Sequence, residues 1–79
     1  MYYLAEARFK RIDTAGKEVD GYAYRTGWST SADSVINQLR GDIAANEEPI
    51  GEVKYVSFGP FNSLLEAERE SDKHVKGME

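Results

Sequence analysis

With 79 residues the chain is too short for a second independently folded domain, and we expect one small core. It has no cysteine, which excludes disulfides, thiol nucleophiles and cysteine-based zinc sites. Its formal net charge of -4 argues against a general attraction to phosphate backbones. The first residues lack the pattern of a signal peptide, and no segment approaches the roughly 20 apolar residues of a membrane span. We therefore expect an acidic, soluble, cytoplasmic protein.

Alternating side chains predict two strands, 2–12 and 19–28, and Asp13-Thr14-Ala15-Gly16 has the composition of a tight turn that ends in a left-handed glycine. The two strands then form a hairpin whose register follows from that turn. On one face the predicted cross-strand pairs are Lys10 with Asp20, Arg8 with Tyr22, Glu6 with Tyr24, Leu4 with Thr26 and Tyr2 with Trp28.

The other face of this hairpin carries small residues and is predicted to be the core face. Phe9 lies beside Gly21 and Tyr3 beside Gly27, so an aromatic ring can cover each glycine. The pairing of Ala5 with Arg25 fits less well, because the charge of Arg25 must leave the sheet edge or meet an acid. A register slip by one residue would exchange the two faces.

Helical periodicity follows from about residue 32, with Ala32, Val35, Ile36, Leu39 and Ile43 on one stripe, and Pro49 ends the segment. Residues 52–59 alternate again as a third strand. The sequence Ser63-Leu64-Leu65-Glu66 is a capping box that opens a second helix. Its apolar stripe is thin, and we expect it to fray beyond about Asp72.

The predicted fold is therefore α+β, with the element order β-β-α-β-α. A right-handed crossover places the third strand beside the first, which gives a three-stranded antiparallel sheet in the order 2-1-3. We expect both helices to pack on one face, and we assign residues 1–72 to a single domain and 73–79 to a frayed C-terminal tail.

The face left open by this arrangement is rich in aromatic side chains, which favour interfaces because they bury a large area at low entropic cost. The alternative is that these rings only stabilise the hairpin through cross-strand contacts. The predicted interaction surface consists of Tyr2, Arg8, Tyr22, Tyr24, Trp28 and Tyr55.

No catalytic centre is evident. His74 is the single histidine, and in a thinly patterned tail we interpret it as a solvated residue. We expect no cofactor and no metal site. Aromatic residues among Arg8, Lys10 and Arg25 resemble a nucleic-acid surface only weakly, because Glu6, Glu18 and Asp20 interleave with them.

The sequence thus predicts a non-enzymatic protein-interaction or regulatory module, a homodimer or a partner of another protein, that uses the tyrosine-rich face or a sheet edge. The alternative is an accessory regulator that binds nucleic acid or blocks a nucleic-acid-handling complex by acidic mimicry.

Overall fold

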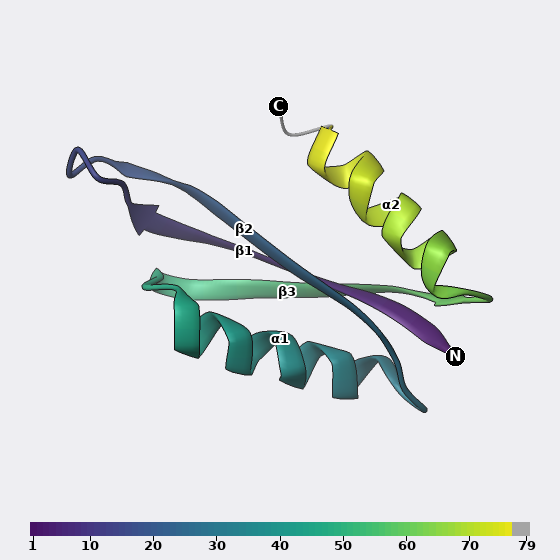
Figure 1. The fold of residues 1–79 in the computed structure, drawn as a ribbon. Coiled ribbons are helices and arrows are strands. Elements are labelled where there is room, and N and C mark those ends of the chain that lie inside the picture. Colours follow the sequence, from purple (N-terminus) through teal and green to yellow (C-terminus); the bar gives the residue numbers. More distant parts are fainter. Residues whose placement is uncertain (77–79) are drawn as a thin grey trace.

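Two helices enclose a three-stranded antiparallel sheet in the computed structural model, which describes residues 1–76 (Figure 1). The elements are β1 (Tyr2–Ile12), β2 (Glu18–Trp28), α1 (Ala32–Asn46), β3 (Ile50–Phe61) and α2 (Leu64–Lys76). The strands lie in the order β2-β1-β3, and both pairings are antiparallel. The predicted α+β class, element order and sheet topology are confirmed. Neither helix combines the length and the apolar character that a bilayer crossing requires within these residues.

The β1–β2 hairpin has the predicted register along its whole length, from Tyr2 opposite Trp28 to Ile12 opposite Glu18. The turn is closed by a hydrogen bond of 2.8 Å from the Asp13 amide to the Lys17 carbonyl, and Gly16 has the expected positive φ of 80°. The turn chemistry therefore sets which side chains share a face, as the sequence indicated.

Only one of the two predicted aromatic–glycine contacts is present. The ring of Phe9 lies against Gly21 so closely that a Cβ at that position would overlap it, which confirms the first contact. No atom lies within 4 Å of the position that a Cβ would take at Gly27, so the prediction that Tyr3 covers this glycine is wrong. The Tyr3 ring lies instead beside Gly59 of β3, because β1 is flanked by strands on both sides and the ring turns toward β3.

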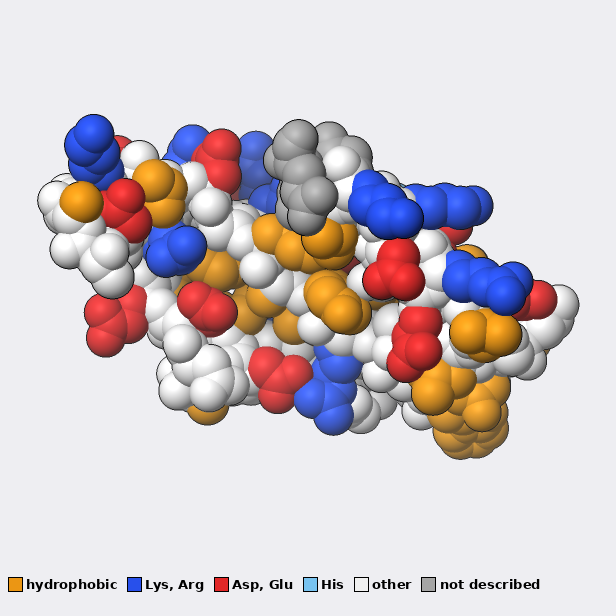
Figure 2. All heavy atoms as spheres, turned by 45° about the horizontal axis from the view of Figure 1, so that its top comes forward, with side chains coloured by type: hydrophobic (Ala, Val, Ile, Leu, Met, Phe, Trp, Pro, Cys, Tyr) orange, Lys and Arg blue, Asp and Glu red, His pale blue; other side chains and the backbone are white. Residues whose placement is uncertain are grey.

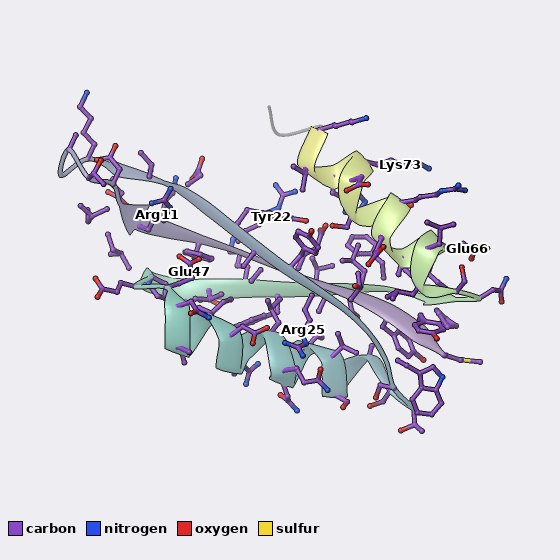
Figure 3. The ribbon with its side chains drawn as sticks, viewed as in Figure 1. Arg11, Tyr22, Arg25, Glu47, Glu66 and Lys73 are labelled. Carbon is purple, nitrogen blue, oxygen red and sulfur yellow. The ribbon has the colours of Figure 1, made fainter. Side chains whose placement is uncertain are left out.

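The main core lies between α1 and the small-residue face of the sheet, as predicted. Arg25 projects from this face toward α1 and donates hydrogen bonds to Gln38 (2.9 Å) and Asp42 (2.7 Å), so its charge does find an acid (Figure 3). The buried side chains of this core, all at most 6% exposed, are Ala5, Ala7, Phe9, Val35, Leu39 and Ile43.

The second helix lies on the opposite face, and the prediction that both helices share one face is wrong (Figure 1). Leu4 and Glu6 point away from the α1 core because side chains alternate along a strand, yet both are buried, at 0% and 2% exposed. The cover is α2, which presents the small buried side chains Ala67 and Ser71. Since α1 already occupies the first face, α2 buries its own stripe by packing on the second.

The helix α2 also continues to Lys76, four residues beyond the predicted end of the domain. Residues 73–76 are helical, and the part of the predicted frayed tail at 77–79 lies outside the described residues.

Candidate functional site

The second face of the sheet, on the side of α2, collects five of the six residues predicted to form the interaction surface. Three of them come from β2 and two from β1, and the observed register aligns them as cross-strand neighbours. The face is not fully open as expected, because α2 packs on it, starting beside the end of β3 (Figure 1). The residues that share this face are Tyr2, Arg8, Tyr22, Tyr24 and Trp28.

Tyr55 does not belong to this surface. It pairs with Ala7 of β1, whose side chain lies in the α1 core, so Tyr55 projects toward α1 as well. There the guanidinium of Arg40 lies 4.9 Å from the centre of the Tyr55 ring. The turn between β1 and β2 fixes only the register of that hairpin. The sequence contains no comparable signal for the register of β3 against β1, which decides the face on which Tyr55 lies.

A polar network joins α2 to the sheet at the centre of the second face. The Glu6 carboxylate accepts a hydrogen bond of 2.6 Å from the Tyr22 hydroxyl and lies 2.5 Å from Nδ1 of His74. The other ring nitrogen of His74, Nε2, lies 3.1 Å from Glu70. The imidazole also packs edge-on against the Phe58 ring, with 4.7 Å between the ring centres.

Burial and charge determine the titration of this network. The hydrogen bond to Glu6 raises the pKa of His74 above its ordinary value, while partial burial acts in the opposite direction. Burial, with a further contribution from the hydrogen bond to Glu6, raises the pKa of Tyr22 strongly, so the phenol stays protonated. The network therefore favours an imidazolium that bridges two carboxylates.

The interpretation of His74 as a solvated residue is wrong, since only 21% of its side chain is exposed. The spacing of Ala67, Ser71 and His74 by four and three residues could have indicated that His74 shares the inner stripe of α2. Both ring nitrogens face carboxylates, so neither is available to take a proton from a substrate in this arrangement. The geometry suits attachment of the helix.

One end of the molecule exposes large apolar side chains, and we call it the apolar end. Figure 2 shows hydrophobic side chains gathered where α2 begins. Tyr2 of β1 pairs there with Trp28 of β2 and Phe61 of β3, and the Ser29 amide donates to the Met1 carbonyl at 2.9 Å. The most exposed members are Trp28 (63%), Met1 (62%), Leu65 (56%) and Leu64 (42%).

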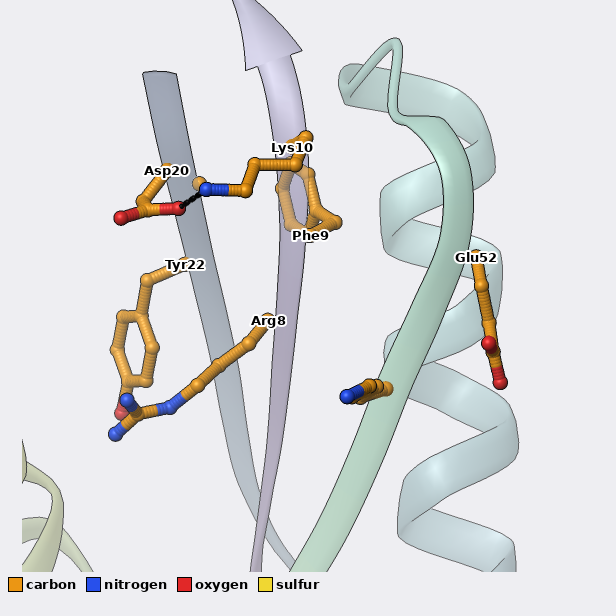
Figure 4. Close-up of a pocket in the computed structure, with 8 residues that line it drawn as sticks. Arg8, Phe9, Lys10, Asp20, Tyr22 and Glu52 are labelled. Carbon is orange, nitrogen blue, oxygen red and sulfur yellow. Dashed lines mark hydrogen bonds and ion pairs between the residues drawn. The ribbon is translucent and has the colours of Figure 1, made fainter. Parts of the chain in front are cut away.

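Toward the hairpin turn, beyond α2, the second face is hollowed, and we call this region the basic hollow (Figure 4). It has a volume of about 580 Å³. Lys10 and Asp20 form an ion pair across the two strands at its edge. The Arg8 guanidinium lies 6.0 Å from the centre of the Tyr22 ring. The lining consists of Arg8, Phe9, Lys10, Asp20, Gly21, Tyr22, Glu52 and Lys54.

No family model, curated protein or solved structure matched this chain in comparisons with known proteins. Within residues 1–76 no three His, Cys, Asp or Glu side chains are grouped so that they could hold a metal ion. Glu6 and Glu70 lie against opposite ring nitrogens of His74 and do not converge on one point.

Proposed function

We propose that this protein is a non-enzymatic interaction module that self-associates by pairing β2 with β2 of a second copy. The observation that carries the proposal is the regularity of β2 as an edge strand. It is eleven residues long, lies at one side of the sheet and ends in the exposed Trp28. Such an edge is a template for another strand because its outer backbone groups lack strand partners.

The two edges of the sheet differ in how they are protected. β3 contains Pro60, glycines with positive φ at positions 51 and 59, and two irregularities in its register with β1. Proline and irregular pairing are features that discourage edge-to-edge association. β2 contains neither proline nor lysine and pairs with β1 without interruption. Pairing through β2 is therefore favoured over pairing through β3.

The register identifies the backbone groups that face outward. The Asp13 amide donates to Lys17 and the Ser29 amide donates to Met1, so odd-numbered positions of the two strands form the hydrogen-bonded pairs. In an antiparallel ladder the alternate residues of an edge strand point their N–H and C=O groups away from the partner. The residues with outward groups in β2 are Glu18, Asp20, Tyr22, Tyr24, Thr26 and Trp28.

Side chains and size support the same contact. Tyr24 and Trp28 lie on the second face and are 47% and 63% exposed, so pairing through β2 would bring aromatic rings of the two copies near the seam. A chain of 79 residues buries roughly 60% of its unfolded surface on folding, a smaller share than larger domains bury, and a six-stranded sheet across two copies would add to that burial.

The test is the molar mass in solution of the chain and of two variants at position 26. Thr26→Pro removes one outward N–H and none that bonds β1, whereas Thr26→Val keeps the backbone donor. We expect dimers for the wild type and Thr26→Val at concentrations on the order of 100 μM, and monomers for Thr26→Pro, by light scattering after gel filtration.

A monomeric wild type, or a Thr26→Pro variant that dimerises as well as Thr26→Val, would refute the proposal. If circular dichroism shows that Thr26→Pro loses structure, Tyr24→Glu replaces it, because a carboxylate at the seam repels its symmetry mate without removing a backbone group. The proposal then requires that Tyr24→Glu is monomeric and keeps the circular dichroism spectrum of the wild type.

A further inference from the structure

We propose that the basic hollow binds the phosphate group of a small phosphate ester. The site lies on the face of the sheet near the hairpin turn, whereas the proposed self-association uses the edge of β2. The two proposals therefore stand independently.

The hollow contains a pair of neighbouring cations. Arg8 of β1 and Lys54 of β3 are direct cross-strand partners on the same face. Like charges in this position destabilise a sheet, whereas the neighbouring pair of Lys10 with Asp20 is complementary. Within residues 1–76 no acidic side chain forms an ion pair with Arg8 or Lys54. A bound anion between them would relieve the repulsion.

The balance of charges around the hollow favours an anion. Its lining carries three cations and two carboxylates, an excess of one positive charge in a chain whose formal net charge is -4. Asp20 is engaged by Lys10, and Figure 4 shows Glu52 on the far side of β3 with its carboxylate directed away from Arg8. Neither carboxylate stands between Arg8 and the open space.

Neighbouring side chains hold Tyr22 and Arg8 of the hollow in place. The Tyr22 hydroxyl donates a hydrogen bond of 2.6 Å to the buried Glu6 carboxylate, and this contact fixes the orientation of the ring. Arg8 in turn lies over this ring at 6.0 Å, a cation–π distance, so its planar guanidinium is oriented before a ligand arrives. A pre-oriented side chain loses less entropy on binding.

The groups also fit a phosphate. Arginine offers a fork of N–H donors that matches two oxygens of a phosphate, and lysine adds a point charge for the third. A volume of about 580 Å³ exceeds that of a bare phosphate and lies within the range of small-ligand sites. The ring of Tyr22 and the alkyl stem of Lys54 provide apolar surface for the organic part. The hollow is therefore sized for a phosphate ester.

The experiment is a titration of ¹⁵N-labelled protein with adenosine monophosphate at low salt, followed by amide chemical shifts. We expect saturable shifts at Arg8, Tyr22 and Lys54 with a Kd on the order of 1 mM or below. Adenosine, which lacks the phosphate, should leave these amides unchanged. Lys54→Gln should weaken binding by roughly fivefold to tenfold, since it removes one charge-assisted hydrogen bond.

Lys17→Gln is the matched control, because Lys17 lies in the exposed hairpin turn outside the hollow and its loss changes the net charge equally. It should alter the Kd by less than about twofold. The proposal is overturned if adenosine monophosphate shifts no hollow amide, if adenosine gives the same shifts, or if Lys17→Gln weakens binding as much as Lys54→Gln.

An oligothymidylate of about ten nucleotides distinguishes the source of the phosphate. Binding of the oligonucleotide without binding of the mononucleotide would assign the cations to a nucleic-acid surface and overturn the proposal. The Thr26→Pro variant, monomeric if the self-association proposal holds, should bind adenosine monophosphate as the wild type does. Failure of one proposal can thus be separated from failure of the other.

Discussion

The contact of His74 with Glu6 predicts that stability falls as the pH rises above about 6.5. The perturbation is His74→Gln, which keeps a side chain of similar length but cannot carry a positive charge. In the wild type the pKa of His74 is raised by its hydrogen bond to Glu6. The folded state therefore binds a proton more tightly than the unfolded state does, and the resulting stabilisation is complete below the unfolded value of about 6.5. It is lost as the pH rises through the raised pKa.

The expected magnitude follows from burial. The Glu6 side chain is 2% exposed, and breaking a fully buried ion pair costs about 3–5 kcal/mol. The His74 side chain is 21% exposed and can be reached by water, and Tyr22 remains as a donor to Glu6, so we expect a loss of about 2 kcal/mol at pH 6. Folded domains have roughly 0.05–0.15 kcal/mol of stability per residue, so this loss is a large fraction of the total.

Urea denaturation at a fixed protein concentration, followed by circular dichroism between pH 6 and pH 9, measures the effect. With an m-value of about 1 kcal/mol/M, His74→Gln should lower the midpoint by roughly 2 M at pH 6. The difference from the wild type should shrink toward pH 9. Lys73→Gln is the control, because Lys73 is exposed and only approaches Glu70, at 4.0 Å. A wild-type midpoint that does not change between pH 6 and pH 9, or a pH dependence retained by His74→Gln, would refute the reasoning.

Two further predictions concern the α1 core. Gly21→Ala should lower stability by about 1–3 kcal/mol, because the new methyl group overlaps the Phe9 ring, whereas Gly27→Ala, with no atom within 4 Å, should change it by less than about 0.5 kcal/mol. Equal effects in urea denaturation would contradict the Phe9 contact. Leu39→Ala should cost about 3 kcal/mol, since Leu39 is 1% exposed, and a loss below about 1 kcal/mol would mean that α1 is only loosely docked.

The first face of the sheet could be predicted from the sequence because each of its signals is local. The turn at Asp13–Gly16 fixes the register of β1 with β2, and the register determines that the small residues share a face. The apolar stripe of α1 then matches that face in length and character. Turn chemistry and periodicity operate over a few residues, and here they agree with each other.

The cover of the second face by α2 could not be predicted because the contacting residues are distant in the sequence. Glu6 alternates with apolar residues, and this pattern is typical of a solvated position, yet 68 residues later His74 supplies the contact that allows its burial. Small residues at 67 and 71 are what a helix needs to lie close to a sheet, but they also resemble a poor amphipathic stripe. Hydrophobicity alone does not distinguish the two cases.

The central position of Tyr22 links the network under α2 to the basic hollow. Its hydroxyl helps to satisfy the buried Glu6, and its ring supports Arg8, so one side chain belongs to both regions. A residue that only stabilised the hairpin would need the ring and not the hydroxyl contact. Because Glu6 also faces His74, the same carboxylate that attaches α2 fixes the orientation of Tyr22. One buried carboxylate therefore contacts both the helix α2 and the tyrosine that lines the hollow.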